Sequence, residues 1–196
     1  DMTLYQISNS CSFVLNYLQF VDNIYNNFYK GSTKFPAINL NKEGLLEHDV
    51  FIHNKKEMWN RYLEDLSNSM NSSPSSEAIT ISDLQYITNP PLFNHLFKDK
   101  SNSESAWNLF QSWYWAQTFG CQYVNENVSH TLILNMSETL TSHKAIPNFL
   151  ITSIYDDLPD GLESTKDNIF VFSITELSLP NGFHNITEKI LNHFRG

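Results

Sequence analysis

The stretch Asn168-Ile169-Phe170-Val171-Phe172-Ser173-Ile174 is the clearest strand signal in the chain, because aromatic and β-branched side chains fill it. Working back from it, similar signals predict strands at 148–154 and 129–135. Shorter apolar stretches predict two more strands, at 48–53 and 78–82. These segments together indicate a β-sheet whose strands come from the whole length of the chain.

Helical periodicity marks the segments between these strands. Apolar residues recur at spacings of three and four from Leu4 to Phe28, which predicts a long N-terminal helix that Gly31 ends. Further helices are expected over 55–70, 103–119 and 184–194. In the third of these four helices, the pair Ser101 and Glu104 predicts a capping box at the start, and Gly120 is expected to close the end.

Interspersed helices and strands predict an α/β or α+β fold, with a mixed sheet of about five to six strands and helices packed on it. The strand signals between 121 and 135 predict a hairpin around Asn125-Glu126-Asn127. At 196 residues, the chain is expected to form a single domain, 1–196. The loop 71–77, rich in Ser and Asn, is a possible weak internal boundary.

Charge and cysteine content exclude several functions. The formal net charge is −9 and only Arg61 and Arg195 are arginines, which argues against nucleic-acid binding and favours a basic partner. No apolar run is long enough for a membrane span. Cys11 and Cys121 form no CxxC pair and no basic leader is visible, so we expect an intracellular location, cytoplasmic or nuclear.

Motif absences narrow the chemistry further. The sequence contains no GxGxxG, GxxxxGK[ST], GxSxG or HExxH motif, which argues against dinucleotide, P-loop, serine-hydrolase and helical zinc sites. We therefore expect no cofactor. Cys11 belongs to an apolar stripe and is expected to be structural, whereas Cys121, directly after Gly120, is the better candidate for a reactive thiol.

Three carboxylates follow the expected strand at 148–154, namely Asp156, Asp157 and Asp160. Carboxylates at a strand end are typical ligands for Mg²⁺ in α/β enzymes. A metal-dependent hydrolase or transferase would use these residues with a divalent cation, and His130 or His143 would serve as general base. The competing interpretation is a simple turn, since Asp, Pro and Gly are turn-forming residues.

Aromatic side chains suggest a second kind of site. In the expected helix 103–119, Trp113 and Trp115 flank the main apolar face on opposite sides. Phe13, Tyr17 and Phe20 form a second stripe on the N-terminal helix. Either neighbouring elements cover these residues as core, or some of them contact a protein partner, because Trp and Tyr dominate interface hot spots.

The leading hypothesis is a non-enzymatic protein–protein interaction domain: a regulatory subunit, a scaffold module or an acidic inhibitor of a basic partner. An inhibitor whose acidic face mimics nucleic acid is a special case of this hypothesis. The metal-dependent enzyme with Asp156, Asp157 and Asp160 is the alternative.

Overall fold

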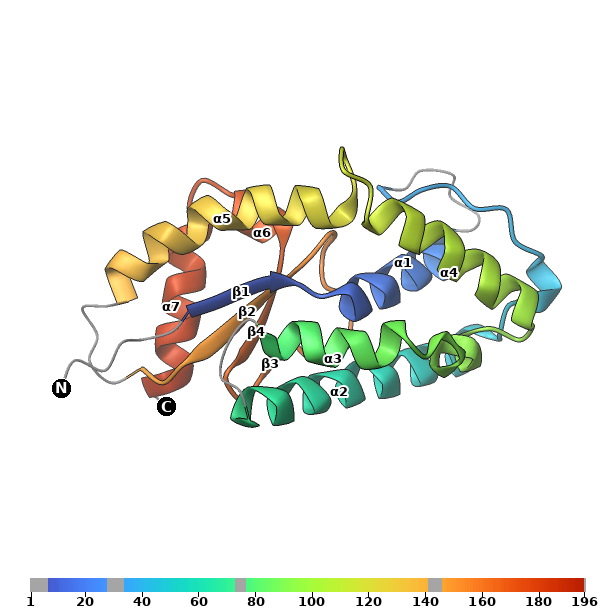
Figure 1. Ribbon diagram of the computed structural model, residues 1–196, viewed down its shortest axis with the longest axis horizontal. Coiled ribbons are helices and arrows are strands. Elements are labelled where there is room, and N and C mark those ends of the chain that lie inside the picture. Colours follow the sequence, from blue (N-terminus) through green and yellow to red (C-terminus); the bar gives the residue numbers. More distant parts are fainter. Residues whose placement is uncertain (1–6, 28–33, 73–76, 141–145, 196) are drawn as a thin grey trace.

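A four-stranded sheet lies between two groups of helices (Figure 1). The computed structural model describes residues 7–27, 34–72, 77–140 and 146–195. The strand order is β1-β2-β4-β3. Strands β1 (Ile7–Cys11), β2 (Phe149–Ile154) and β4 (Ile169–Ser173) run parallel, and the short β3 (Thr165–Lys166) pairs antiparallel with β4.

The central strand β2 sets the register of the sheet. It pairs Phe149 with Ile7 of β1, and Leu150 with Ile169 of β4. All six of its side chains are buried. A parallel strand covered by helices on both faces is expected to be rich in apolar residues, and β2 follows this pattern except at Thr152 and Ser153.

The helices divide between the two faces of the sheet. One group consists of α1 (Phe13–Asn27), α2 (His48–Ser72), α3 (Glu77–Ile87) and α4 (Lys100–Tyr114), with 3₁₀ turns at Lys42–Gly44 and Pro90–Leu96. The other consists of α5 (Cys121–Leu140), α6 (Ile174–Ser178) and α7 (Gly182–Arg195). Leu150 and Ile154 of β2 join the core under the first group, whereas Phe149 and Ile151 join the core under the second.

The mixed α/β architecture is confirmed, and so are the expected strands at 148–154 and 168–174 and the expected C-terminal helix. The strand count was too high, because the sheet of the described residues has four strands and the protein is mostly helical. No helix in the described ranges is long and apolar enough to cross a membrane.

The prediction of a long N-terminal helix was wrong for the first part of that segment. Residues 7–11 form β1, and α1 begins at Phe13. The 3,4 spacing of Leu4, Ile7 and Cys11 imitated a helix, but Ser8, Asn9 and Ser10 are weak helix formers. Parallel pairing with β2 therefore decides the local structure. Gly31 lies outside the described residues.

Three further strand predictions were wrong. Residues 48–53, 78–82 and 129–135 lie inside α2, α3 and α5. In α3, the buried side chains of Ala78, Ile79 and Ser82 follow helical spacing while Ile81 is exposed. The hairpin expected around Asn125 is likewise part of α5.

The helix expected at 103–119 has different ends. It begins after Asp99, whose side chain accepts a hydrogen bond from the Asn102 N–H, so Asp99 rather than Ser101 is the N-cap. It ends at Tyr114, and Gly120 instead precedes α5.

Candidate functional site

The carboxyl ends of β1, β2 and β4 meet at one edge of the sheet, beside the start of α1 (Figure 1). Ligands of open α/β sheets bind at this edge, where successive connections leave on opposite faces. After β2, Tyr155 and Leu158 pack on the core under α1–α4, whereas Leu177 of α6 packs on the other core after β4. A crevice is therefore expected between segment 155–158 and α6.

Two small hollows occupy this crevice. One has a volume of about 390 Å³ and is lined by Lys34, Tyr155, Ile174, Thr175, Ser178 and Leu179. The other, of about 250 Å³, includes Asp157, Ser173, Glu176 and Lys189 in its lining. Small-molecule sites span about 300–1,000 Å³, so the larger hollow lies at the lower end of that range and the smaller one lies below it.

The larger hollow offers little for acid–base catalysis. The Lys34 ammonium pairs with the Asp156 carboxylate, and this hydrogen bond raises the pKa of Lys34. Burial raises the pKa of the Tyr155 phenol. At neutral pH the amine is therefore charged and the phenol is neutral, so neither group is a ready general base.

The start of α1 is the position where an open α/β fold would bind an anion, and the protein's own Asp83 occupies it. The Asp83 carboxylate accepts hydrogen bonds from the Phe13 N–H at 2.7 Å and the Val14 N–H at 3.2 Å. The Ser12 and Tyr62 hydroxyls also donate to it, at 3.1 and 2.6 Å. An external phosphate would have to displace this buried carboxylate.

Burial and hydrogen bonding act in opposite directions on Asp83. Burial disfavours its charged form, while the hydrogen bonds from Tyr62, Phe13, Val14 and Ser12 favour that form. Burial is the larger effect and raises the pKa from 3.8 to about 6. At neutral pH the carboxylate is still mostly ionised, so it complements the positive end of the α1 dipole.

Two amides of α1 fix the chain as it leaves β2. The Asn16 side chain donates to the Ser153 carbonyl at 3.0 Å and accepts from the Tyr155 N–H at 2.7 Å. Gln19 donates to the Asp156 and Asp157 carbonyls and accepts from the Asp156 N–H. The backbone polar groups at this strand end are thus used within the protein.

The metal hypothesis finds no support in this geometry. Asp156 is paired with Lys34, and Asp157 and Asp160 are exposed. Within the described part of the chain, no three His, Cys, Asp or Glu side chains are grouped so that they could hold a metal ion. His130 belongs to α5, and His143 lies outside the described residues.

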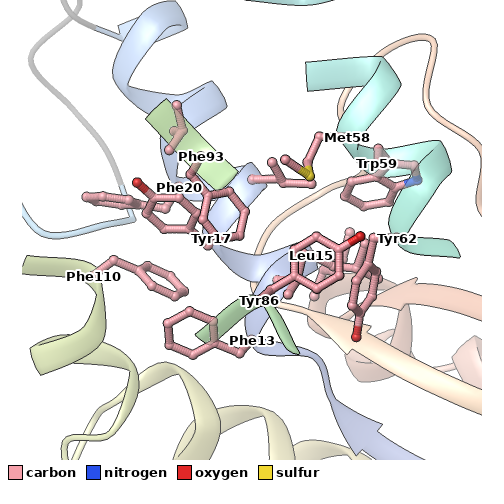
Figure 2. Packing of buried hydrophobic residues seen from close by; sticks show 14 of the residues in the cluster. Phe13, Leu15, Tyr17, Phe20, Met58, Trp59, Tyr62, Tyr86, Phe93 and Phe110 are labelled. Carbon is pink, nitrogen blue, oxygen red and sulfur yellow. The ribbon is translucent and has the colours of Figure 1, made fainter. Parts of the chain in front are cut away.

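Three of the expected partner-binding residues are core residues. Phe13, Tyr17 and Phe20 are no more than 1% exposed. Figure 2 shows them beside Phe110, whose ring centroid lies 5.1, 5.2 and 5.4 Å from theirs. An approaching protein cannot reach them, so of the two interpretations of this stripe, the core is the one that the burial supports.

The two tryptophans differ in exposure. Trp113 is half-buried and its ring lies edge-on to Phe35 and Tyr155, at 5.5 and 4.9 Å. Trp115 is 48% exposed, and its inner face stacks on Phe13 at 6.0 Å. Trp115 is therefore held against the core and yet presents half of its surface to solvent.

Three exposed aromatic residues lie close in sequence at the α4–α5 connection, which projects from the top of the molecule in Figure 1. Trp115 and Phe119 belong to the connection and Tyr123 to the first turn of α5, and we term the three the aromatic corner. Phe119 is 76% exposed and has a left-handed backbone, with φ of 65°. A Cβ at Gly120 would lie 2.3 Å from the Ala116 carbonyl oxygen, so the tight turn requires glycine.

The sequence pattern alone did not indicate a functional role for Phe119, Tyr123 or Asp83. For Phe119 a signal existed, since it lies directly before a glycine, outside the stripe of Trp107, Phe110 and Tyr114. For Asp83 no local signal existed, because its partners come from distant parts of the chain.

Comparisons with protein-family models, with curated proteins and with solved structures found no match for this chain.

Proposed function

We propose that the protein is a non-enzymatic interaction domain that binds a basic protein partner through the aromatic corner. The main observation in support of this proposal is Phe119, a large apolar side chain that is 76% exposed on a left-handed backbone. Left-handed backbone costs roughly 1–2 kcal/mol for a residue other than glycine. Such strain concentrates at functional positions, and the exposure of the ring gains nothing within the fold.

The residue types in the aromatic corner, and the packing that holds Trp115 in place, both favour binding. Trp and Tyr are enriched among the residues that dominate interface energetics, and both occur here. Trp115 is held by its stacking on Phe13, and the adjacent Tyr114 hydroxyl donates to the Cys11 carbonyl at 2.6 Å. A partner would therefore meet a surface that is already ordered, which lowers the entropy cost of association.

Another exposed apolar pair offers a comparison. Ile81 and Leu84 lie on α3 and are 46% and 55% exposed. They are aliphatic, their helix has ordinary backbone geometry, and exposed aliphatic residues are normal on protein surfaces. Leu84 is therefore the matched control position for tests of the corner.

Charge supports a basic partner. The formal net charge is −9, and the exposed Asp157 lies two residues after Tyr155, whose ring contacts Trp113 at the end of α4. Acidic surroundings accelerate encounter with a basic surface and make binding weaken with salt. The roles that suit such a surface are those of a regulatory subunit, a scaffold module or an acidic inhibitor, and a nucleic-acid mimic would show the steepest salt dependence.

Selection of displayed peptides tests this proposal without a known partner. Peptides from a random library are selected on the wild-type protein, with Phe119→Ser as counter-selection. We expect the enriched peptides to carry Lys and Arg beside an apolar anchor, and to bind less tightly as salt is added. Enrichment that is equal on wild type and Phe119→Ser, or enrichment of acidic peptides, would refute the proposal.

A further inference from the structure

We propose that the larger hollow, between segment 155–158 and α6, is a binding site for a small monocarboxylic acid with an apolar chain. It lies outside the carboxyl ends of β2 and β4, where the chain leaves the sheet toward opposite faces. Open α/β sheets bind their ligands at this position. The volume of about 390 Å³ is within the range of small-molecule sites, and the lining shares no residue with the aromatic corner.

The lining defines the charge of the ligand. Among the described residues, Lys34 is the only charged side chain that lines this hollow. An ammonium group has more donor hydrogens than one ion pair uses, so Lys34 can pair with Asp156 and also bind a ligand carboxylate. Tyr155 and Thr175 bring hydroxyl donors to the same lining. A single positive charge matches a monocarboxylate, whereas a phosphate dianion would keep uncompensated charge.

The pairing with Asp156 holds the Lys34 ammonium at the hollow. The Asp156 carboxylate also accepts from the Asp157 N–H at 2.9 Å, and the Asp156 N–H donates to Gln19 at 2.8 Å. Asp156 itself does not line the larger hollow, and the exposed Asp157 lines the smaller one. A carboxylate outside the hollow therefore positions the cation, and the ligand meets the ammonium inside it.

Apolar side chains complete the hollow. Ile174 and Leu179 line it from α6 and its carboxyl end, and Leu179 is 52% exposed. A ligand chain that covers Leu179 removes this surface from water, which is favourable. The Tyr155 ring lies edge-on to Trp113 at 4.9 Å, so this side of the hollow is ordered before a ligand arrives. Such preorganisation lowers the entropy cost of binding.

The test is a titration of the whole, isotope-labelled protein with straight-chain carboxylates from butyrate to hexanoate, followed by the NMR shifts of backbone amides. We expect the largest shifts at Tyr155, Thr175 and Leu179. The affinity should rise roughly threefold to fourfold with each added methylene, because each buries more apolar surface. Hexanol, which has the same chain without the charge, should bind at least about tenfold more weakly than hexanoate.

Three results of this titration would overturn the proposal. The first is the absence of shifts with hexanoate, and the second is a set of shifts that maps to the aromatic corner or to α3. The third is an affinity that is equal for hexanol and hexanoate or that does not change with chain length. None of these outcomes depends on whether Phe119 binds a protein partner.

Matched variants locate the two halves of the site. Lys34→Met keeps an unbranched side chain at an exposed position and should bind hexanoate at least about tenfold more weakly, with hexanol unaffected. Lys98→Met changes the net charge equally at an exposed lysine outside the hollow and should bind as wild type does. Leu179→Ser should weaken hexanoate more than butyrate. Equal losses in Lys34→Met and Lys98→Met, with both proteins folded by circular dichroism, would show that Lys34 does not bind the carboxylate.

Discussion

Replacement of Asp83 by asparagine should change how the stability of the protein depends on pH. The carboxylate is buried at the start of α1, and its pKa in the folded state is about 6 against 3.8 without the fold. A raised pKa means that the folded state binds the proton more tightly than the unfolded state does. This contribution to stability is therefore complete below pH 3.8 and is lost as the pH rises through about 6.

The size of the effect follows from the two pKa values. Their difference is about two units, and each unit corresponds to about 1.4 kcal/mol. Between about pH 7 and about pH 4, wild type should gain roughly 2–3 kcal/mol of unfolding free energy relative to Asp83→Asn, whose amide does not titrate. This direction is the reverse of that for an aspartate stabilised by a salt bridge.

The assay is urea unfolding of both proteins at a series of pH values, followed by circular dichroism. Because all other titrating groups are common to both proteins, the difference between the two unfolding free energies isolates Asp83. A difference that is flat with pH, or that favours wild type more strongly at neutral pH, would show that the hydrogen bonds from Phe13 and Val14 outweigh burial. Our assignment of burial as the dominant effect would then be wrong.

Three other stability measurements test particular contacts. The Tyr17 hydroxyl is buried and has no hydrogen-bond partner among the described residues, so Tyr17→Phe should raise the unfolding free energy by about 1 kcal/mol. Tyr114→Phe loses the hydrogen bond to the Cys11 carbonyl and should lower the unfolding free energy by about 1 kcal/mol. Phe119→Gly should be more stable than Phe119→Ala by about 1 kcal/mol in urea unfolding, because glycine adopts a φ of 65° without strain; equal stabilities would contradict the strain. Lys55→Met should cost about 3–5 kcal/mol by thermal unfolding, since it leaves the Asp22 carboxylate without its buried cation, and Asp22→Asn in the same chain should recover much of the loss.

The sequence predicted the centre of the sheet well and its edge poorly. Residues 149–151 and 169–172 are continuous apolar runs, which is the pattern of strands buried on both faces. In β1, polar residues stand between Ile7 and Cys11, so the segment becomes a strand only through pairing with β2, which is distant in the sequence. The apolar stretches at 48–53, 78–82 and 129–135 were too short to distinguish a strand from a buried helix face.

Only part of the candidate site could be predicted from the sequence. The aromatic character of the α4 end was visible, and Trp115 was among the expected partner-binding residues. The exposure of Phe119 depends on where α4 ends, and helix ends are the least predictable feature of a sequence. The Asp83 network joins segments far apart in the chain, so it could not be found before the fold was known.

The most direct test of binding at the aromatic corner is a titration with the tightest basic peptide from the selection. The dissociation constants of wild type, Phe119→Ser and Leu84→Ser are compared at one salt concentration. We expect Phe119→Ser to bind at least tenfold more weakly, a loss of about 1.4 kcal/mol or more, and Leu84→Ser to bind as wild type does. Equal affinities for wild type and Phe119→Ser, or a larger loss in Leu84→Ser, would show that the corner is not the binding surface.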